Sequence, residues 1–148
     1  EKQKNNYIEN FSFLDSPNIR VLNSVFSVET LEYIQSLDTS TKNNKWLISN
    51  SPSWIKGTQT AIEYAKNNDL EYELVWGLAH KDLLKKMAES KGVIYLPPGG
   101  DTCPRFIIEA KMLDCELILN ENVQHKNEDW FRKKEDTIEH MKTRAKVF

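Results

Sequence analysis

Residues that could hold a phosphorylated ligand gather in the stretch GGDTCPRFIIEA, which follows an apolar run. Gly99 and Gly100 allow a close backbone approach, including positive φ angles. Thr102 or Cys103 is predicted to cap a helix whose first turn contains Pro104. The start of that helix would offer free N–H groups and partial positive charge to a phosphate. A plain, well-capped strand-to-helix turn explains the same residues equally well.

Glu109 lies inside this predicted helix, among apolar residues that face the interior. It follows Pro104 by five residues, which is roughly 7–8 Å along the helix axis. A carboxylate there can accept hydrogen bonds from sugar hydroxyls while phosphates stay at the helix start. The alternative is an i,i+4 ion pair with Arg105, which the residue types alone favour.

Lys56 follows another predicted strand, in the sequence WIKG. A lysine at the carboxyl end of a sheet can neutralise a pyrophosphate, although a solvated surface lysine is commoner. The neighbouring Trp54 can be a lid, a stacking surface or part of the core. Asp101 can bind sugar hydroxyls or only shape its turn. Cys103 has no histidine near it in the sequence to act as a base, so we interpret it as a small loop residue.

Strand and helix patterns alternate along the chain. Short apolar runs predict strands, and 3.6-residue periodicity predicts helices between them. Because the strands are apolar on both faces, as buried parallel strands are, we expect an α/β fold. It should be a Rossmann-like three-layer α/β/α domain with a parallel sheet of about five strands. The expected strands are 19–26, 45–49, 71–77, 92–97 and 116–120; the expected helices are 28–37, 58–68, 80–90, 104–113 and roughly 126–146.

Three loops leave strand ends with suggestive residues, namely 49–57, 76–80 and 97–103. Ligands of open parallel sheets bind beyond the carboxyl ends of the strands. We therefore expect the three loops, with Lys56 and Asp101, to lie at one edge.

Composition narrows the classes of function. The 148 residues suit one domain, and the net charge of −2 gives no basic excess for nucleic acid. No apolar run approaches the roughly 20 residues of a membrane span. The two cysteines are not a CxxC pair, which favours free thiols and a cytoplasmic location. The three histidines are scattered and predict no metal site.

Taken together, these residues resemble the C-terminal, donor-binding domain of GT-B glycosyltransferases of the large glycogen-synthase-like group 1 family. Asp101 and Glu109 have the spacing of the family's two acidic residues, with seven residues between them. The following AKMLDCELILNENV is similar to the family's continuation, and WIKG is similar to its Lys-Gly motif. The resemblance covers roughly residues 19–131. The departures are Asp101 in place of Glu, Asp114 in place of Gly, and no Arg shortly before Lys56.

The resemblance implies a role for each of these residues. Glu109 would hold the ribose of a nucleotide sugar such as a UDP-sugar, and Lys56 would contact the donor phosphates. Asp101, with the backbone of Thr102 and Cys103, would contact the donor sugar. Gly99 and Gly100 would form part of the wall against the donor phosphate and sugar. Arg105 would pair with Glu109 or substitute for the missing arginine. The family needs no metal or other cofactor.

The resemblance also implies a partner domain. Enzymes of this family work in a cleft between two domains, and the N-terminal one binds the acceptor. We expect residues 1–18 to be an interdomain linker or helix remnant, 19–125 to be the nucleotide-sugar domain, and 126–148 to be a helix packing across the linker. Without the acceptor domain, this chain should bind its donor weakly and transfer little. The alternative is a non-catalytic nucleotide or sugar-phosphate binding module on the same fold.

Overall fold

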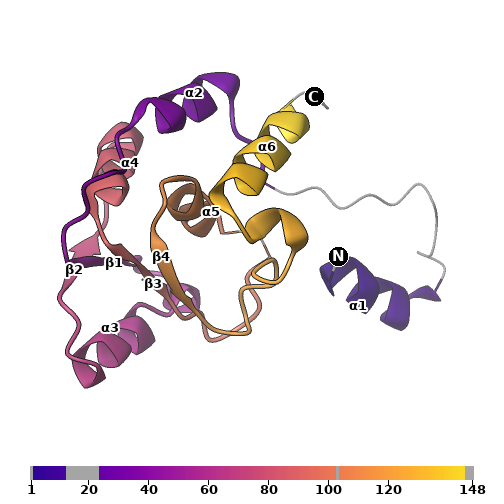
Figure 1. Ribbon diagram of the computed structural model, residues 1–148. Coiled ribbons are helices and arrows are strands. Elements are labelled where there is room, and N and C mark those ends of the chain that lie inside the picture. The colour runs from indigo at the N-terminus through magenta and orange to yellow at the C-terminus, as the bar shows by residue number, and fades with distance from the viewer. Residues whose placement is uncertain (1, 13–23, 103, 146–148) are drawn as a thin grey trace.

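The computed structural model describes residues 2–12, 24–102 and 104–145. Figure 1 shows a sheet of four parallel strands, in the order β2-β1-β3-β4, with helices between successive strands. The strands are β1 (Trp46–Ser49), β2 (Tyr72–Val75), β3 (Gly92–Tyr95) and β4 (Glu116–Leu119). The helices are α1 (Lys2–Asn10), α2 (Val28–Ser36), α3 (Thr58–Asn67), α4 (His80–Glu89), α5 (Arg105–Met112) and α6 (Lys134–Ala145).

The parallel α/β architecture predicted from alternating strands and helices is confirmed. Pairing in register sets Ser49 opposite Val75 and Tyr95 opposite Leu119, so the carboxyl ends of the strands lie along one edge. The sheet has four described strands where about five were expected. Residues 24–26 of the expected first strand are in an irregular segment, and residues 19–23 lie outside the described part of the chain.

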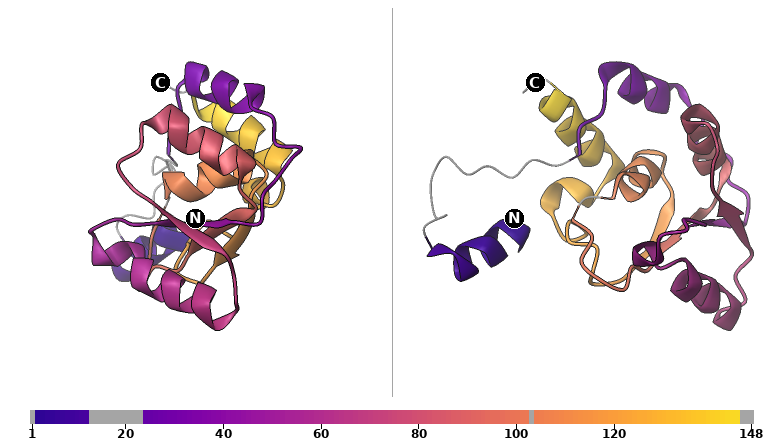
Figure 2. Two further views of the ribbon diagram at one scale, coloured as in Figure 1. Left: turned by 90° about the vertical axis from the view of Figure 1, so that its left-hand side faces the viewer. Right: turned by 180° about the vertical axis from the view of Figure 1, so that it is seen from behind.

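Helices cover both faces of the sheet, which gives the expected three layers (Figure 2). On one face α4 and α5 pack on the strands, with α2 and α6 beyond them. This larger core includes Leu47, Val93 and the fully buried Ile107 and Ile108 of α5. On the other face α3 packs alone against Ile48 and its neighbours. The larger core lies beneath α5, so α5 holds its side chains on the better-packed face.

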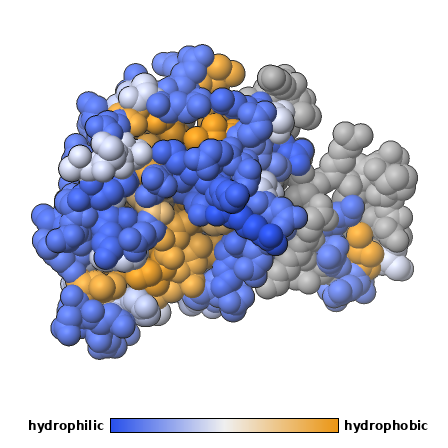
Figure 3. Space-filling model, viewed as in Figure 1, coloured by the Kyte–Doolittle hydropathy of each residue, from blue (hydrophilic) through white to orange (hydrophobic). Residues whose placement is uncertain are grey.

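The face under α3 is less completely covered. Ile62, Leu70 and Ile118 pack against its small core but remain partly exposed. Figure 3 shows apolar surface among hydrophilic residues on this side of the molecule. Part of the apolar surface therefore remains accessible to solvent on this face.

Local signals explain where the helices begin. Ser27 caps α2, as predicted, because its hydroxyl accepts a hydrogen bond from the N–H of Thr30. The C-terminal helix was predicted from about residue 126, but α6 begins only at Lys134. The segment before it forms turns and the short 3₁₀ helix η3 (Asp129–Phe131) instead. It does so because Val123 forms a parallel bridge with Asp101 and is buried there.

Candidate functional site

The loop that carries Lys56 is held rigidly against the end of β3. Its 3₁₀ turn, η2 (Trp54–Lys56), ends at Gly57 with a φ of 69°. A Cβ at Gly57 would lie only 2.0 Å from the carbonyl oxygen of Leu96. Only glycine combines this left-handed conformation with so close a backbone contact. The loop after β1 is therefore fixed next to the glycine loop after β3.

Lys56 and Asp101 meet at this edge, as the loop positions predicted. The Lys56 Nζ donates to Asp101 Oδ2 at 3.0 Å, and the Tyr95 hydroxyl donates to the same oxygen at 2.5 Å. The Asp101 side chain is 14% exposed and that of Lys56 is 40% exposed. Burial and the neighbouring Asp101 carboxylate raise the pKa of Tyr95, so this phenol stays a donor.

The backbone of the glycine loop is tied to the residues after β4. The Asp101 N–H donates to the carbonyl of Asn122 at 2.8 Å, and the Gln124 N–H donates to the carbonyl of Asp101 at 3.1 Å. The side chains of Asn120 and Asn122 both donate to the carbonyl of Pro97. These hydrogen bonds tie the loop after β3 to the segment after β4.

The two glycines of the loop do not adopt the positive φ angles that they were predicted to allow. The described glycines with positive φ are Gly57 and Gly77, not Gly99 and Gly100. A Cβ at Gly99 would meet no atom within 4 Å, whereas one at Gly100 would meet the Gln124 amide at 2.9 Å. Gly99 therefore leaves an open face on the loop.

The prediction for the start of α5 was wrong in one respect. The helix begins at Arg105, and its N-cap is Pro104, which makes no side-chain capping bond. Pro104 takes that place because its backbone is extended, with a ψ of 112°. Thr102 is exposed, and Cys103 lies outside the described residues. The helix start thus lacks the side-chain cap that Thr102 or Cys103 was expected to provide.

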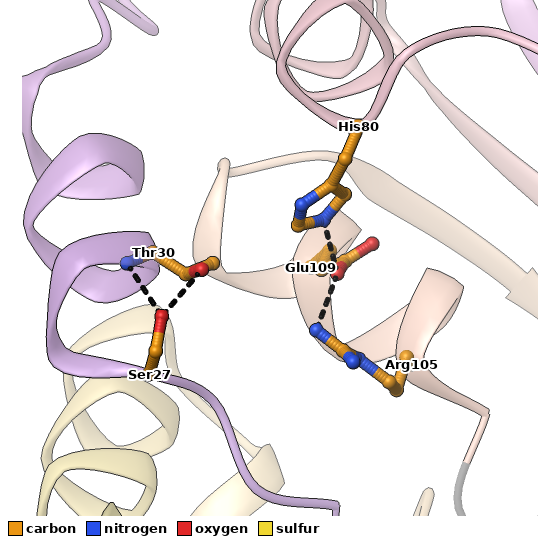
Figure 4. A network of polar contacts seen from close by, with 5 residues as sticks. All are labelled: Ser27, Thr30, His80, Arg105 and Glu109. Atoms are coloured by element: carbon orange, nitrogen blue, oxygen red, sulfur yellow. Dashed lines mark hydrogen bonds and ion pairs between the residues drawn. The ribbon is translucent and has the colours of Figure 1, made fainter.

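Glu109 is a buried carboxylate that contacts a histidine ring and an arginine. The His80 Nε2 contacts its Oε1 at 2.8 Å, and an Arg105 nitrogen approaches the same oxygen at 3.6 Å (Figure 4). The Glu109 side chain is 5% exposed. Burial raises its pKa, while the hydrogen bond and charge of His80 and the charge of Arg105 lower it in part.

Arg105 is held by Phe26 as well as by Glu109. Its guanidinium lies 4.7 Å from the centre of the Phe26 ring, a cation–π distance. Of the two positions expected for Arg105, the structure thus has the one beside Glu109. The other Glu109 oxygen, which points away from this network in Figure 4, has no hydrogen-bond partner among the described residues.

A buried histidine lies behind the Asp101 loop. His125 is 4% exposed, and its ring stacks on Trp130 at 5.3 Å and meets Phe131 edge-on at 4.5 Å. Neither ring nitrogen has a hydrogen bond of normal geometry within the described chain, although the backbone of Thr102 approaches it. Burial lowers the pKa of His125 to about 4, against the opposing effects of Thr102 and Asp101.

Two hollows accompany these residues at the strand ends. A cavity of about 250 Å³ lies between the ends of β1 and β2 and α5, and Ser49, Trp76 and Phe106 are among its lining residues. A smaller one of about 120 Å³ lies between the starts of α2 and α4, where Thr30, His80 and Lys81 line it. Figure 4 shows the Thr30 side chain on the side of α2 that faces His80 and Glu109.

Sequence reasoning missed the two residues that hold the carboxylates. His80 lies 29 residues before Glu109, and Tyr95 is an apolar-looking final residue of β3. The only signal for His80 was its position in a strand-end loop. Nothing in the sequence marks Tyr95, because its role depends on the loop that folds back over it.

Comparison of the chain with protein-family models, with curated proteins and with solved structures gives no match. Within the described ranges, no group of three or more His, Cys, Asp or Glu side chains is arranged to hold a metal ion. No helix in the described part of the chain has the length and apolar character needed to cross a bilayer. The domain is a small Rossmann-like α/β unit with a four-stranded parallel sheet.

Proposed function

We propose that this domain binds a nucleoside diphosphate sugar and forms the donor-binding half of a glycosyltransferase. The observation that carries the proposal is the pair of carboxylates near the carboxyl end of the sheet, each with its own cation. Asp101 is paired with Lys56, and both residues lie on strand-end loops. Glu109, within α5, contacts His80 and Arg105, which are the first residues of α4 and α5. Such edges are where open α/β sheets bind ligands.

Each group has a task that suits its surroundings. Glu109 is nearly buried and has one oxygen without a partner in the described chain, so it can accept hydrogen bonds from the ribose hydroxyls. Lys56 is a flexible cation that can reach the diphosphate. Asp101, on the loop whose Gly99 face is open, contacts the donor sugar.

Lys56 must be released from Asp101, at least in part, to serve a phosphate. The lysine side chain is 40% exposed, and ion pairs of that exposure contribute only about 0–1 kcal/mol. A diphosphate carries more charge than one carboxylate and competes well for the amine. Tyr95 still donates to Asp101 after Lys56 has moved, so the carboxylate keeps a partner.

Transfer itself requires a second domain. We propose an N-terminal acceptor-binding domain as the partner of this one, with the donor held in the cleft between them. The domain alone then binds nucleotide sugar weakly and transfers little. The proposed chemistry uses Lys56 and the helix start of α5 in place of a metal ion to balance the phosphate charge.

A non-catalytic nucleotide or sugar-phosphate binding module is the second candidate. The observation in its favour is that both carboxylates have cationic partners within the domain itself, Lys56 for Asp101 and Arg105 for Glu109. Sites of that kind can bind an anion by partner exchange without doing chemistry. Slow hydrolysis of a bound nucleotide sugar would favour the transferase, and its absence the binding module.

A titration without metal tests the proposal. The chain is titrated with UDP, GDP, ADP and their sugars in the presence of a chelator, and heat or chemical-shift changes are measured. At least one nucleotide should bind at millimolar concentration or tighter, and Glu109→Gln should weaken it. Absence of binding for every compound at millimolar concentration would contradict both candidate functions.

A further inference from the structure

A pocket of about 270 Å³ lies beside the proposed donor site, at the exit of β1. Among the residues that the structure describes, no charged side chain lines it. Its walls are hydroxyl, amide and apolar groups, and the lining residues include Asn50, Ser53, Trp54, Thr60 and Pro98. The volume is close to the lower end of small-molecule sites, about 300 Å³, and suits one ring with substituents.

Trp54 presents an open aromatic surface to this pocket. Trp54 is 78% exposed, whereas Trp46 in the core is 5% exposed. The turn that carries Trp54 is rigid, because the Lys56 N–H donates to Ser53, the Gly57 N–H donates to Trp54, and Gly57 packs on Leu96. Covering a large, solvent-exposed apolar ring with a ligand is favourable, because it removes apolar surface from water.

Several polar groups around the ring are available to a ligand. The side chains of Asn50, Ser53 and Thr60 make no hydrogen bond with any described residue. By contrast, Thr58 donates to the carbonyl of Ser49, and Gln59 donates to Glu63. The pocket therefore has an apolar platform with neutral donors and acceptors beside it.

We propose that this pocket binds a neutral sugar ring, stacked on Trp54 and hydrogen-bonded to Asn50, Ser53 and Thr60. The C–H face of a sugar is apolar and its hydroxyls both donate and accept, which matches this mixture of groups. A phosphate is disfavoured because no cation lines the pocket; Lys56, on the same turn, is paired with Asp101.

The position of the pocket gives the sugar a role. Pro98, which forms part of its wall, is next to Gly99 on the proposed donor loop. A saccharide in the pocket would lie beside the transferred sugar, where this domain would hold one end of the acceptor that the proposed N-terminal domain binds. This role rests on the proposed function, whereas binding of the saccharide does not, because it needs no nucleotide.

The test follows the indole N–H signals of the ¹⁵N-labelled chain by NMR without nucleotide. The probes are maltotriose, cellotriose, mannotriose and tri-N-acetylchitotriose, each up to tens of millimolar. The Trp54 signal, identified by its loss in Trp54→Phe, should shift in a saturable manner with at least one of them. Trp54→Ala should abolish the binding of that sugar, and Asn50→Ala should weaken it severalfold.

Trp76→Ala is the matched control, since Trp76 is also exposed and lies on the next strand-end loop but does not line this pocket. It should leave saccharide affinity unchanged. Three results would overturn the proposal: no trisaccharide shifts the Trp54 signal, inorganic phosphate shifts it equally, or Trp54→Ala binds as well as the natural chain. Nucleotide binding, measured separately, reports on the donor site alone.

Discussion

The two carboxylates of the proposed site are held in different ways. Asp101 sits on a loop, where Lys56 and Tyr95 share one of its oxygens and backbone bonds fix the loop from behind. Glu109 sits on a helix in the interior, where burial raises its pKa and His80 compensates only in part. The first depends on loop geometry and the second on electrostatic compensation, so each should fail under a different perturbation.

Acid should separate the two regions most plainly. Behind the Asp101 loop, burial lowers the pKa of His125, so that region loses stability as the pH falls. In the Glu109 region the carboxyl pKa is raised, which has the opposite effect on stability. The free energy of unfolding there decreases as the pH rises. The protein thus contains two buried titratable groups with opposite effects on the pH dependence of its stability.

The largest effect should come from Gly57→Ala, which breaks the Asp101 region. Its methyl group would overlap the Leu96 carbonyl, and the residue would be strained at a φ of 69°. Together these should lower the free energy of unfolding by about 2–4 kcal/mol in urea. Gly99→Ala is the control and should change it by less than about 0.5 kcal/mol, since that methyl group meets nothing. Equal losses in the two variants would show that Gly57 does not anchor the loop.

Acid unfolding should have the next largest effect. The folded pKa of His125 is about 4 and its ordinary value is 6.5, so its contribution to stability is lost as the pH falls through this range. The expected loss is about 1–3 kcal/mol in the free energy of unfolding. His125→Phe, which keeps a ring against Trp130, should flatten the dependence. An unchanged slope in that variant would assign the acid sensitivity to other groups.

Features that depend on neighbouring residues could be predicted from the sequence better than contacts between residues far apart in the chain. The Ser27 cap and the parallel strands follow from local residue types, and the sequence predicts them. Parallel topology also brings Lys56 to Asp101, because both follow strands of one sheet. The late start of α6 was missed because a bridge to Asp101 ties down the preceding segment.

The partners of the carboxylates were beyond sequence reasoning for a similar reason. His80 reaches Glu109 only because α4 and α5 pack side by side on the sheet. Tyr95 reads as the last apolar residue of a buried strand, and its hydroxyl becomes important only when the following loop folds back. Side-chain partners chosen by tertiary packing leave no local pattern.

Lys56→Ala should reduce affinity for nucleoside diphosphates by about tenfold, which is about 1.4 kcal/mol, because it removes the cation proposed for the phosphates. The affinity for the corresponding nucleoside should change much less. Calorimetric titration measures both. Lys86→Ala is the control, since its ion pair with Glu73 is made away from the carboxyl edge of the sheet, and it should leave both affinities unchanged. Equal losses for nucleoside and diphosphate would contradict the role of Lys56.

A smaller effect on stability is expected in the Glu109 region, where the pH dependence should be opposite to that of His125. The Glu109 carboxyl is protonated more readily in the folded protein than in the unfolded chain. Its contribution to folding stability is therefore complete below the ordinary pKa of 4.5 and is lost as the pH rises above that value. Relative to the natural chain, Glu109→Gln should therefore gain stability as the pH rises toward neutral. His80→Ala should steepen the natural dependence, because it removes the main group that lowers this pKa. Urea unfolding at several pH values measures both; parallel curves for the natural chain and Glu109→Gln would oppose this account.

The central claim is that the two carboxylates contact different parts of one ligand. The most direct measurement compares the affinities of Glu109→Gln and Asp101→Asn for a nucleoside diphosphate and for its sugar conjugate, using the nucleotide that the natural chain binds best. Glu109→Gln should weaken both compounds alike, because the ribose is common to them. Asp101→Asn should weaken only the conjugate. Equal losses on both compounds in both variants, or no loss in either, would contradict the account.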